Sequence, residues 1–222
     1  MDPLKYPCLI LDHDNTVVRT SPDIQYPAFL HSLKCAGLDF SLSEREFLLI
    51  EYEGLPSFIR EHFHLTPKMF QKIDDGWFDY MSRHTAKIYD GMAEVLQRHR
   101  AAGGIITVVT HSPSSNVLRD YKAADLAPPD IIIDASQVPY HNKPRPWPVE
   151  TICLQLQLQH ADCLVVDDKP CGLDMALRSH ASCVVAGWGH TLPETRARIQ
   201  QFYPYEPFLA HPSDLISYLF RT

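Results

Sequence analysis

The feature that most constrains the fold is an alternation of short apolar runs with segments of helical spacing. The runs are CLILD (8–12), GIITVVT (104–110), DIIID (130–134), CLVVDD (163–168) and SCVVAG (182–187). One helix-like segment follows Asp90, which we expect to be its N-cap. Its buried face is predicted to consist of Met92, Val95, Leu96 and His99. Continuous apolar strands that alternate with helices predict an α/β fold, a Rossmann-like parallel sheet core flanked by helices.

A second kind of segment separates the first two strand-like runs. Residues 19–85 contain no strand-like run and have helical spacing instead. Ser43 and Glu46 have the spacing of a capping box, and Gly54 breaks the pattern between two helices. We therefore predict a small all-helical cap at 19–85, inserted into an α/β core formed by 1–18 and 86–222. A loop that leaves the carboxyl end of a parallel strand overlooks the usual ligand crevice, so the insertion is expected to act as a lid.

Charge and composition argue against two classes of partner. The 222 residues include 20 Lys and Arg against 27 Asp and Glu, and no basic run would attract a polyphosphate backbone. No apolar run approaches the length that spans a membrane, and the start lacks a signal-peptide pattern. Cys8, Cys163 and Cys183 lie inside strand-like runs, as reduced core thiols do. We expect a cytoplasmic protein that binds neither nucleic acid nor a membrane.

The first strand ends in two aspartates, Asp12 and Asp14. In an extended backbone, residues i and i+2 point the same way, and two carboxylates placed so repel each other unless a cation or a proton shares the site. A turn or a helix cap is an equally good interpretation of the D-x-D-x-T pattern alone, because Asp14, Asn15 and Thr16 all suit a chain reversal.

Three further sites lie at or beyond the ends of other strands. Thr110, with His111 beside it, offers a hydroxyl and backbone N–H groups to a phosphate, although an ordinary strand-to-helix cap would look the same. Lys143 stands in a loop that Pro144, Pro146 and Pro148 stiffen. A second acidic pair, Asp167 and Asp168, ends the run CLVV. Two acidic strand ends in one parallel sheet indicate a hard cation with oxygen ligands.

Together these residues resemble the four ordered motifs of the haloacid dehalogenase (HAD) superfamily of phosphatases and phosphomutases. The matching stretches are DHDNT (12–16), Thr110, KPRPWP (143–148) and DDKPCGLDMAL (167–177). The phosphoglycolate phosphatase and β-phosphoglucomutase group, with its helical cap in the first loop, is most similar. His13 stands where the family usually has a bulky apolar residue, and Asn15 where it has glycine. Asn tolerates positive φ, so the turn should survive, and His13 should point away from the carboxylates.

The resemblance implies phosphoryl-transfer chemistry. Asp12 would be the nucleophile and Asp14 the general acid and base. Mg²⁺ would be held by Asp12, the backbone carbonyl of Asp14 and Asp168, with Asp167 as a further ligand or neighbour. The phosphate would be bound by Thr110, His111 and Lys143. Asp14 favours hydrolysis of a small-molecule phosphate monoester, with phosphomutase chemistry as the alternative.

Other functions stay open at this point. A receiver-like signalling module and a non-catalytic phosphate-binding module use similar residues, but a receiver has no use for an inserted cap. Glu53 and Gly54, between two predicted cap helices, match the place where relatives contact substrate, and a simple helix break explains them equally well. The sequence distinguishes neither which phosphate ester is bound nor the oligomeric state.

Overall fold

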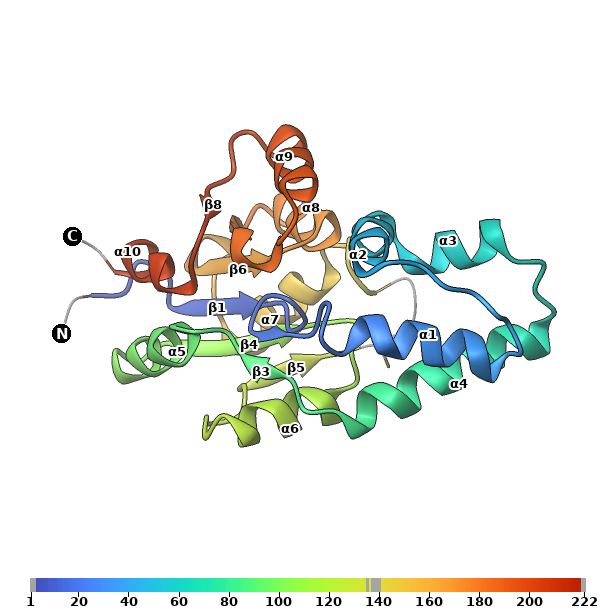
Figure 1. Cartoon of the computed structure of the whole chain (residues 1–222). Helices are drawn as coiled ribbons and strands as arrows, with labels where there is room; N and C mark the ends of the chain where they lie inside the picture. Colours follow the sequence, from blue (N-terminus) through green and yellow to red (C-terminus); the bar gives the residue numbers. More distant parts are fainter. Residues whose placement is uncertain (1–2, 135, 137–140, 221–222) are drawn as a thin grey trace. The chain divides into compact units, whose positions relative to one another are not determined.

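The structure, a computed structural model, describes residues 3–134, 136 and 141–220. The chain forms two compact units: an α/β unit, Met1–Val18 with Lys87–Thr222, and a helical unit, Arg19–Ala86 (Figure 1). The predicted α/β fold with a parallel sheet flanked by helices is confirmed. No described helix is long and apolar enough to cross a membrane.

The sheet of the α/β unit has six strands in the order β5-β4-β1-β6-β7-β8, all parallel to their neighbours. Their bounds are β1 (Cys8–Leu11), β4 (Ile105–Val109), β5 (Ile131–Ile133), β6 (Cys163–Asp167), β7 (Ser182–Ala186) and β8 (Phe208–Leu209). β1, β4 and β6 lie side by side in the centre (Figure 1). Their side chains are almost wholly buried, as expected for strands covered on both faces.

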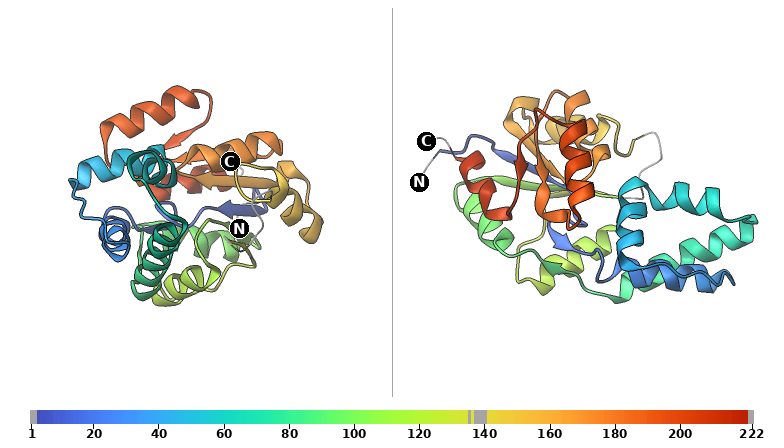
Figure 2. Two further views of the ribbon diagram at one scale, coloured as in Figure 1. Left: turned by 90° about the vertical axis from the view of Figure 1, so that its right-hand side faces the viewer. Right: turned by 45° about the horizontal axis from the view of Figure 1, so that its top comes forward.

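Helices connect the strands and flank the sheet (Figure 2). They are α5 (Met92–Ala101), α6 (Ser114–Ala123), α7 (Trp147–Leu156), α8 (Pro170–Arg178), α9 (Pro193–Phe202) and α10 (Leu215–Leu219). Three short 3₁₀ turns complete the unit, η1 (His160–Asp162), η2 (Gly187–Gly189) and η3 (Pro212–Asp214). Right-handed crossovers place α5 and α6 on one face and α7 and α8 on the other.

This topology fixes where a ligand site can form. From β1 the sheet continues to β4 and β5 in one direction and to β6 and β7 in the other. The crossover direction therefore reverses between β1 and β6, which is the switch point where open α/β sheets bind ligands. The register sets Leu11 beside Val166, and the backbone N–H of Asp12 donates to the Val166 carbonyl at 2.9 Å. The acidic ends of β1 and β6 are thus neighbours.

The helical unit is built from α1 (Gln25–Cys35), α2 (Glu44–Glu53), α3 (Leu55–His62) and α4 (Pro67–Arg83). The predicted capping box is confirmed, since the Ser43 side chain accepts from the Glu46 N–H and the Glu46 carboxylate accepts from the Ser43 N–H. Gly54 separates α2 from α3, as expected. The core of the helical unit is an apolar cluster of Phe29, Leu33, Ala36, Phe47, Ile59 and Ile73.

Three local details differ from or add to the sequence prediction. Gly91, with φ of 85°, is the N-cap of α5, so the prediction of Asp90 is wrong, although the predicted face of that helix is buried. A left-handed residue at the turn favours glycine over aspartate. β8 and the two-stranded pair β2 (Val18–Arg19) and β3 (Lys87–Ile88) were not predicted. Runs of two residues carry too little pattern to identify a strand.

The predicted core positions of three cysteines are confirmed. All six cysteines are free. Cys8, Cys163 and Cys183 are buried in the sheet. Cys153 and Cys163 lie with their Sγ atoms 3.6 Å apart, within the distance at which one thiol donates a weak hydrogen bond to the other.

Candidate active site

The loop after β1 turns at once, which places both of its aspartates near the end of the strand. Asn15 has φ of 60°, so it supplies the positive φ expected of it, and its N–H donates to the Val18 carbonyl at 2.7 Å. Asp12 is only 8% exposed. The Asp14 carboxylate is partly buried and accepts a 2.5 Å hydrogen bond from the Ser112 hydroxyl.

The loop after β6 holds the second acidic pair. One carboxylate oxygen of Asp167 accepts the Lys169 N–H at 2.8 Å, a turn that fixes the side chain. Gly172, in the first turn of α8, lies directly against that carboxylate: a Cβ at Gly172 would stand 1.7 Å from Asp167 Oδ2. Any other residue at this position would displace Asp167. Asp167 and Asp168 are 1% and 2% exposed.

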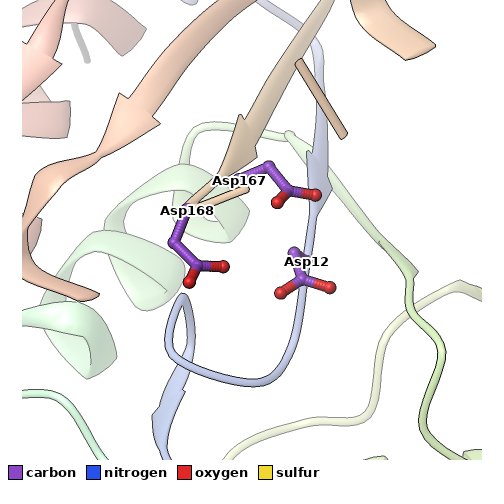
Figure 3. A group of neighbouring side chains, drawn as sticks. All are labelled: Asp12, Asp167 and Asp168. Atoms are coloured by element: carbon purple, nitrogen blue, oxygen red, sulfur yellow. The ribbon is translucent and has the colours of Figure 1, made fainter. Parts of the chain in front are cut away.

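Three carboxylates meet between the two strand ends. Asp12, Asp167 and Asp168 each offer a carboxylate oxygen, and these oxygens all lie within 4.8 Å of one another. Figure 3 shows the three side chains converging from the two loops. A buried, all-oxygen donor set of this kind matches the preference of a hard divalent cation such as Mg²⁺. Asp14 does not contribute its carboxylate to this group, and the predicted metal contact of its backbone carbonyl stays a prediction.

Lys143 joins the two acidic loops. Its ammonium lies 2.7 Å from Asp12 Oδ1 and 2.8 Å from Asp167 Oδ2, and its side chain is 3% exposed. Burial by itself would lower the pKa of Lys143, but the two carboxylates outweigh burial and hold that pKa well above its usual value. Burial raises the pKa of Asp167 to about 6, with the attraction of Lys143 opposing the shift and Asp12 adding to it. The lysine is therefore charged when the carboxylates are.

The loop after β4 contributes hydroxyl groups. Pro113, not Thr110, is the N-cap of α6, so the cap interpretation of Thr110 is wrong. Thr110 is buried, and its Oγ1 accepts the Ser112 N–H at 3.0 Å. Its own O–H remains able to donate. His111 keeps an exposed surface, but the protein around its ring partly desolvates it and, with the nearby Lys143, lowers its pKa. The bond from Ser112 to Asp14 was not predicted, and its only sequence signal is the serine two residues after Thr110.

His13 has a partner that the sequence did not reveal. Its ring is 1% exposed, and Nε2 lies 3.0 Å from Asp120 Oδ2 on α6. Asp120 also accepts the Arg119 Nε–H at 2.8 Å. Burial alone would raise the pKa of Asp120, but the hydrogen bonds from His13 and Arg119 hold it below its usual value. The histidine between the aspartates thus anchors the β1 loop to α6, the helix that follows Ser112.

Glu53 and Gly54 belong to the helical unit. Glu53 ends α2 and is exposed, and Gly54 has φ of 119° with no heavy atom within 4 Å of a Cβ placed there. This open, left-handed link between two helices agrees with the helix break considered from the sequence. Any contact of these residues with a substrate stays a prediction.

Comparison with protein families identifies the chain. Residues 6–180 match the model of the haloacid dehalogenase-like hydrolases. The chain belongs to this family. The match contains Asp12, Thr110, Lys143 and the acidic pair 167–168, so the resemblance predicted from the sequence is confirmed. The predicted enzyme class, a hydrolase of the HAD superfamily, is confirmed with it. No curated protein sequence matches the chain significantly.

Solved structures of the family share the fold over nearly the whole length. A predicted phosphoglycolate phosphatase from Haemophilus somnus is 20% identical, with a TM-score of 0.78 over 96% of this chain and 98% of that one. CbbY from Rhodobacter sphaeroides, solved with phosphate, is 18% identical, with a TM-score of 0.73 over 95% and 96%. A candidate β-phosphoglucomutase from Thermotoga maritima is 18% identical, with a TM-score of 0.66 over 95% and 97%. At such identities the likeness is one of fold.

Proposed function

We propose that this HAD hydrolase is a Mg²⁺-dependent phosphatase that acts on a small-molecule phosphate monoester through an aspartyl-phosphate. The observation that carries the proposal is the convergence of Asp12, Asp167 and Asp168, with Lys143 joining Asp12 to Asp167. Receiver-like and purely phosphate-binding functions are less well supported, because the chain belongs to a family of hydrolases.

In the proposed reaction, a carboxylate oxygen of Asp12 attacks phosphorus while the bond from phosphorus to the ester oxygen breaks. Asp14 gives its proton to the departing oxygen, which leaves as an alcohol. Water then attacks the aspartyl-phosphate as Asp14 takes a proton from it, and the bond from phosphorus to Asp12 breaks to release inorganic phosphate. Ser112 is placed to hold Asp14 in a fixed orientation between these two steps, through the 2.5 Å hydrogen bond.

The remaining groups are proposed to bind Mg²⁺ and the phosphate. Asp12 and Asp168, with the backbone carbonyl of Asp14, are the proposed Mg²⁺ ligands, and Asp167 lies beside them within the same 4.8 Å group. Mg²⁺ supplies positive charge that lets a carboxylate approach a phosphate dianion. Lys143 offers an ammonium to the transferring group, and the free O–H of Thr110 and the adjacent His111 complete the phosphate site.

We propose that the helical unit, residues 19–86, is the cap and supplies substrate contacts from its α2–α3 link at Glu53 and Gly54. This assignment rests on where the insertion occurs, in the loop that follows the strand bearing Asp12. The six free thiols favour a reducing compartment, and we place the protein in the cytoplasm.

The test is phosphate release from a panel of monoesters: p-nitrophenyl phosphate, phosphoglycolate, a sugar phosphate and a nucleoside monophosphate. Release should require Mg²⁺, and Asp12→Asn should lower kcat by at least about 10⁴-fold, as loss of a nucleophile does. Asp125→Asn is the matched control, because Asp125 is an exposed carboxylate of the same unit.

Absence of turnover, or turnover that survives both chelation and Asp12→Asn, would contradict the proposal. Accumulation of an isomerised ester in place of free phosphate would favour the phosphomutase alternative.

A further inference from the structure

A short segment after β7 contacts both acidic loops of the site. The segment, Gly187–His190, comprises the 3₁₀ turn η2 and the residue that follows it. Trp188 and His190 are 7% and 5% exposed, so their polar atoms need partners within the protein. Both partners are backbone carbonyls of the loops that carry the carboxylates.

The contact with the β1 loop is made by Trp188. Its indole Nε1–H donates to the Thr16 carbonyl at 2.9 Å. Thr16 lies in the tight turn that follows Asp14. An indole N–H has no acceptor function and one direction of donation, so this bond fixes the turn relative to the end of β7.

The contact with the β6 loop is made by His190. Its Nε2 lies 2.7 Å from the carbonyl of Asp168, and a carbonyl only accepts, so Nε2 carries the proton. Arg196 Nε–H donates to the His190 carbonyl at 2.6 Å and thereby ties the segment to α9. Asp168, whose carboxylate belongs to the group of three that could bind a metal, is therefore held in place through its own backbone carbonyl.

Gly189 stands between these two donors and touches both loops. A Cβ at this position would lie 2.4 Å from the Asn15 carbonyl oxygen and 3.0 Å from the Asp168 Cβ. The backbone of Gly189 therefore approaches the Asn15 carbonyl and the Asp168 side chain more closely than a residue with a Cβ could. Trp188 thus contacts the β1 loop, Gly189 contacts both loops, and His190 contacts the β6 loop.

We propose that Gly187–His190, the β7 strap, is a positioning element that sets the spacing between Asp12 and Asp168 and so the affinity for Mg²⁺. This inference rests on the proposed function, because it assumes that those carboxylates bind the metal. In this proposal the strap acts through the backbone of the two loops and not by binding metal or substrate itself. Partners of this kind, one shell removed from a metal, govern the orientation of its ligands.

The test is calorimetric titration of the full chain with Mg²⁺ alone. Trp188→Phe keeps an aromatic ring, although a smaller one, and removes the N–H donor, and His190→Leu removes the second donor. Each should weaken Mg²⁺ binding by roughly tenfold or more. His190→Gln retains a donor at the position of Nε2 and should restore the affinity to within about threefold. Trp77→Phe is the matched control, since Trp77 packs on the apolar cluster of the helical unit.

Turnover measured at rising Mg²⁺ concentrations distinguishes a positioning role from a merely structural one, because loss of structure alone would not shift the Mg²⁺ dependence. Trp188→Phe should raise the Mg²⁺ concentration for half-maximal rate, while kcat at saturating Mg²⁺ returns toward that of the unaltered enzyme. Equal Mg²⁺ affinities of the unaltered chain, Trp188→Phe and His190→Leu would overturn the positioning role alone. A loss in His190→Gln as large as in His190→Leu would also overturn it. Failure of the unaltered chain to bind Mg²⁺ would overturn the metal site itself and the strap with it.

Discussion

The two units differ in what they bury. The α/β unit places Asp12, Asp120, Lys143, Asp167 and Asp168 in its interior. The helical unit, residues 19–86, is described in full and buries no Asp, Glu, Lys or Arg. A buried charge lowers stability unless partners compensate it, whereas an apolar cluster stabilises directly. The chemistry of the protein is therefore concentrated in the interior of one unit, and the interior of the other serves packing.

The histidines show the same contrast. Of the eight histidines of the α/β unit, three are buried, His13, His99 and His190, whereas none of the four in the helical unit is. In the helical unit, His62, His64 and His84 are exposed. Substitution of a buried polar group should thus have large effects in the α/β unit, and substitution of a buried aromatic should have large effects in the helical unit.

The largest effect should come from Lys143→Met. This change leaves two buried carboxylates facing each other, so we expect kcat to fall by at least about 10³-fold. The unfolding free energy, measured by urea titration in the presence of a chelator, should fall by about 3–5 kcal/mol. Lys122→Met, which alters an exposed lysine of α6, should leave both unchanged. A Lys143→Met variant as stable and active as Lys122→Met would mean that the buried lysine matters no more than an exposed one.

Phe47→Ala tests the apolar side of the comparison. Phe47 is fully buried and packs its ring against Tyr26 and Phe29, with ring centroids 5.5 and 5.7 Å away. Deletion of a buried aromatic side chain costs about 3–5 kcal/mol, measurable by urea unfolding of the full chain. Phe78→Ala, at a position that is 45% exposed, should cost less than about 0.5 kcal/mol. Equal losses in the two variants would contradict the assignment of the cluster as the core of this unit.

His13→Leu measures the link between the β1 loop and α6. Asp120, which is buried, would lose one of its hydrogen-bond partners, so we expect a loss of about 2 kcal/mol in unfolding free energy. The matched change His64→Leu removes an exposed ring and should cost less than about 0.5 kcal/mol. A small loss in His13→Leu would mean that the contact between His13 and Asp120 contributes little to stability.

The smallest effect concerns pH. Burial lowers the pKa of His99 below 6.5, although the hydrogen bond to the Tyr6 carbonyl opposes the shift. As the pH falls below about 6.5, the unfolded state takes up a proton before the folded state does, so the unfolding free energy should decrease. His99→Gln should flatten that decrease in urea titrations between neutral and mildly acid pH. His84→Gln, at an exposed position, should leave it unchanged. A pH profile insensitive to His99→Gln would mean that the lowered pKa of His99 does not contribute to the decrease.

Much of the fold could be predicted from the order of the apolar strands along the chain. Much of the site could be predicted because its residues stand at the ends of those strands. In a parallel sheet the carboxyl ends of all strands lie at one edge, so chain order alone brings Asp12, Thr110 and Asp167 to that edge. Lys143 could be proposed as well, because prolines restrict its loop. The capping box at Ser43 and the positive φ of Asn15 are local properties, and the sequence predicted both.

The contacts that support the site could not be predicted, because their partners are distant in the chain. His13 and Asp120 are separated by 107 residues, and Trp188 and Thr16 by 172. A buried histidine or tryptophan signals that some acceptor exists, but one sequence does not say which carbonyl or carboxylate it is. The N-cap of α5 was missed for a local reason, the preference of its left-handed turn for Gly91.

Acceptance of the phosphoryl group by Asp12 is the step on which the proposed mechanism depends. It is tested most directly by mass spectrometry of the protein quenched in acid during turnover of p-nitrophenyl phosphate with Mg²⁺. We expect the peptide that contains Asp12 to gain the mass of one phosphoryl group, and Asp12→Asn to abolish the gain together with turnover. A phosphoryl group on another residue, or continued turnover by Asp12→Asn, would contradict the proposed mechanism.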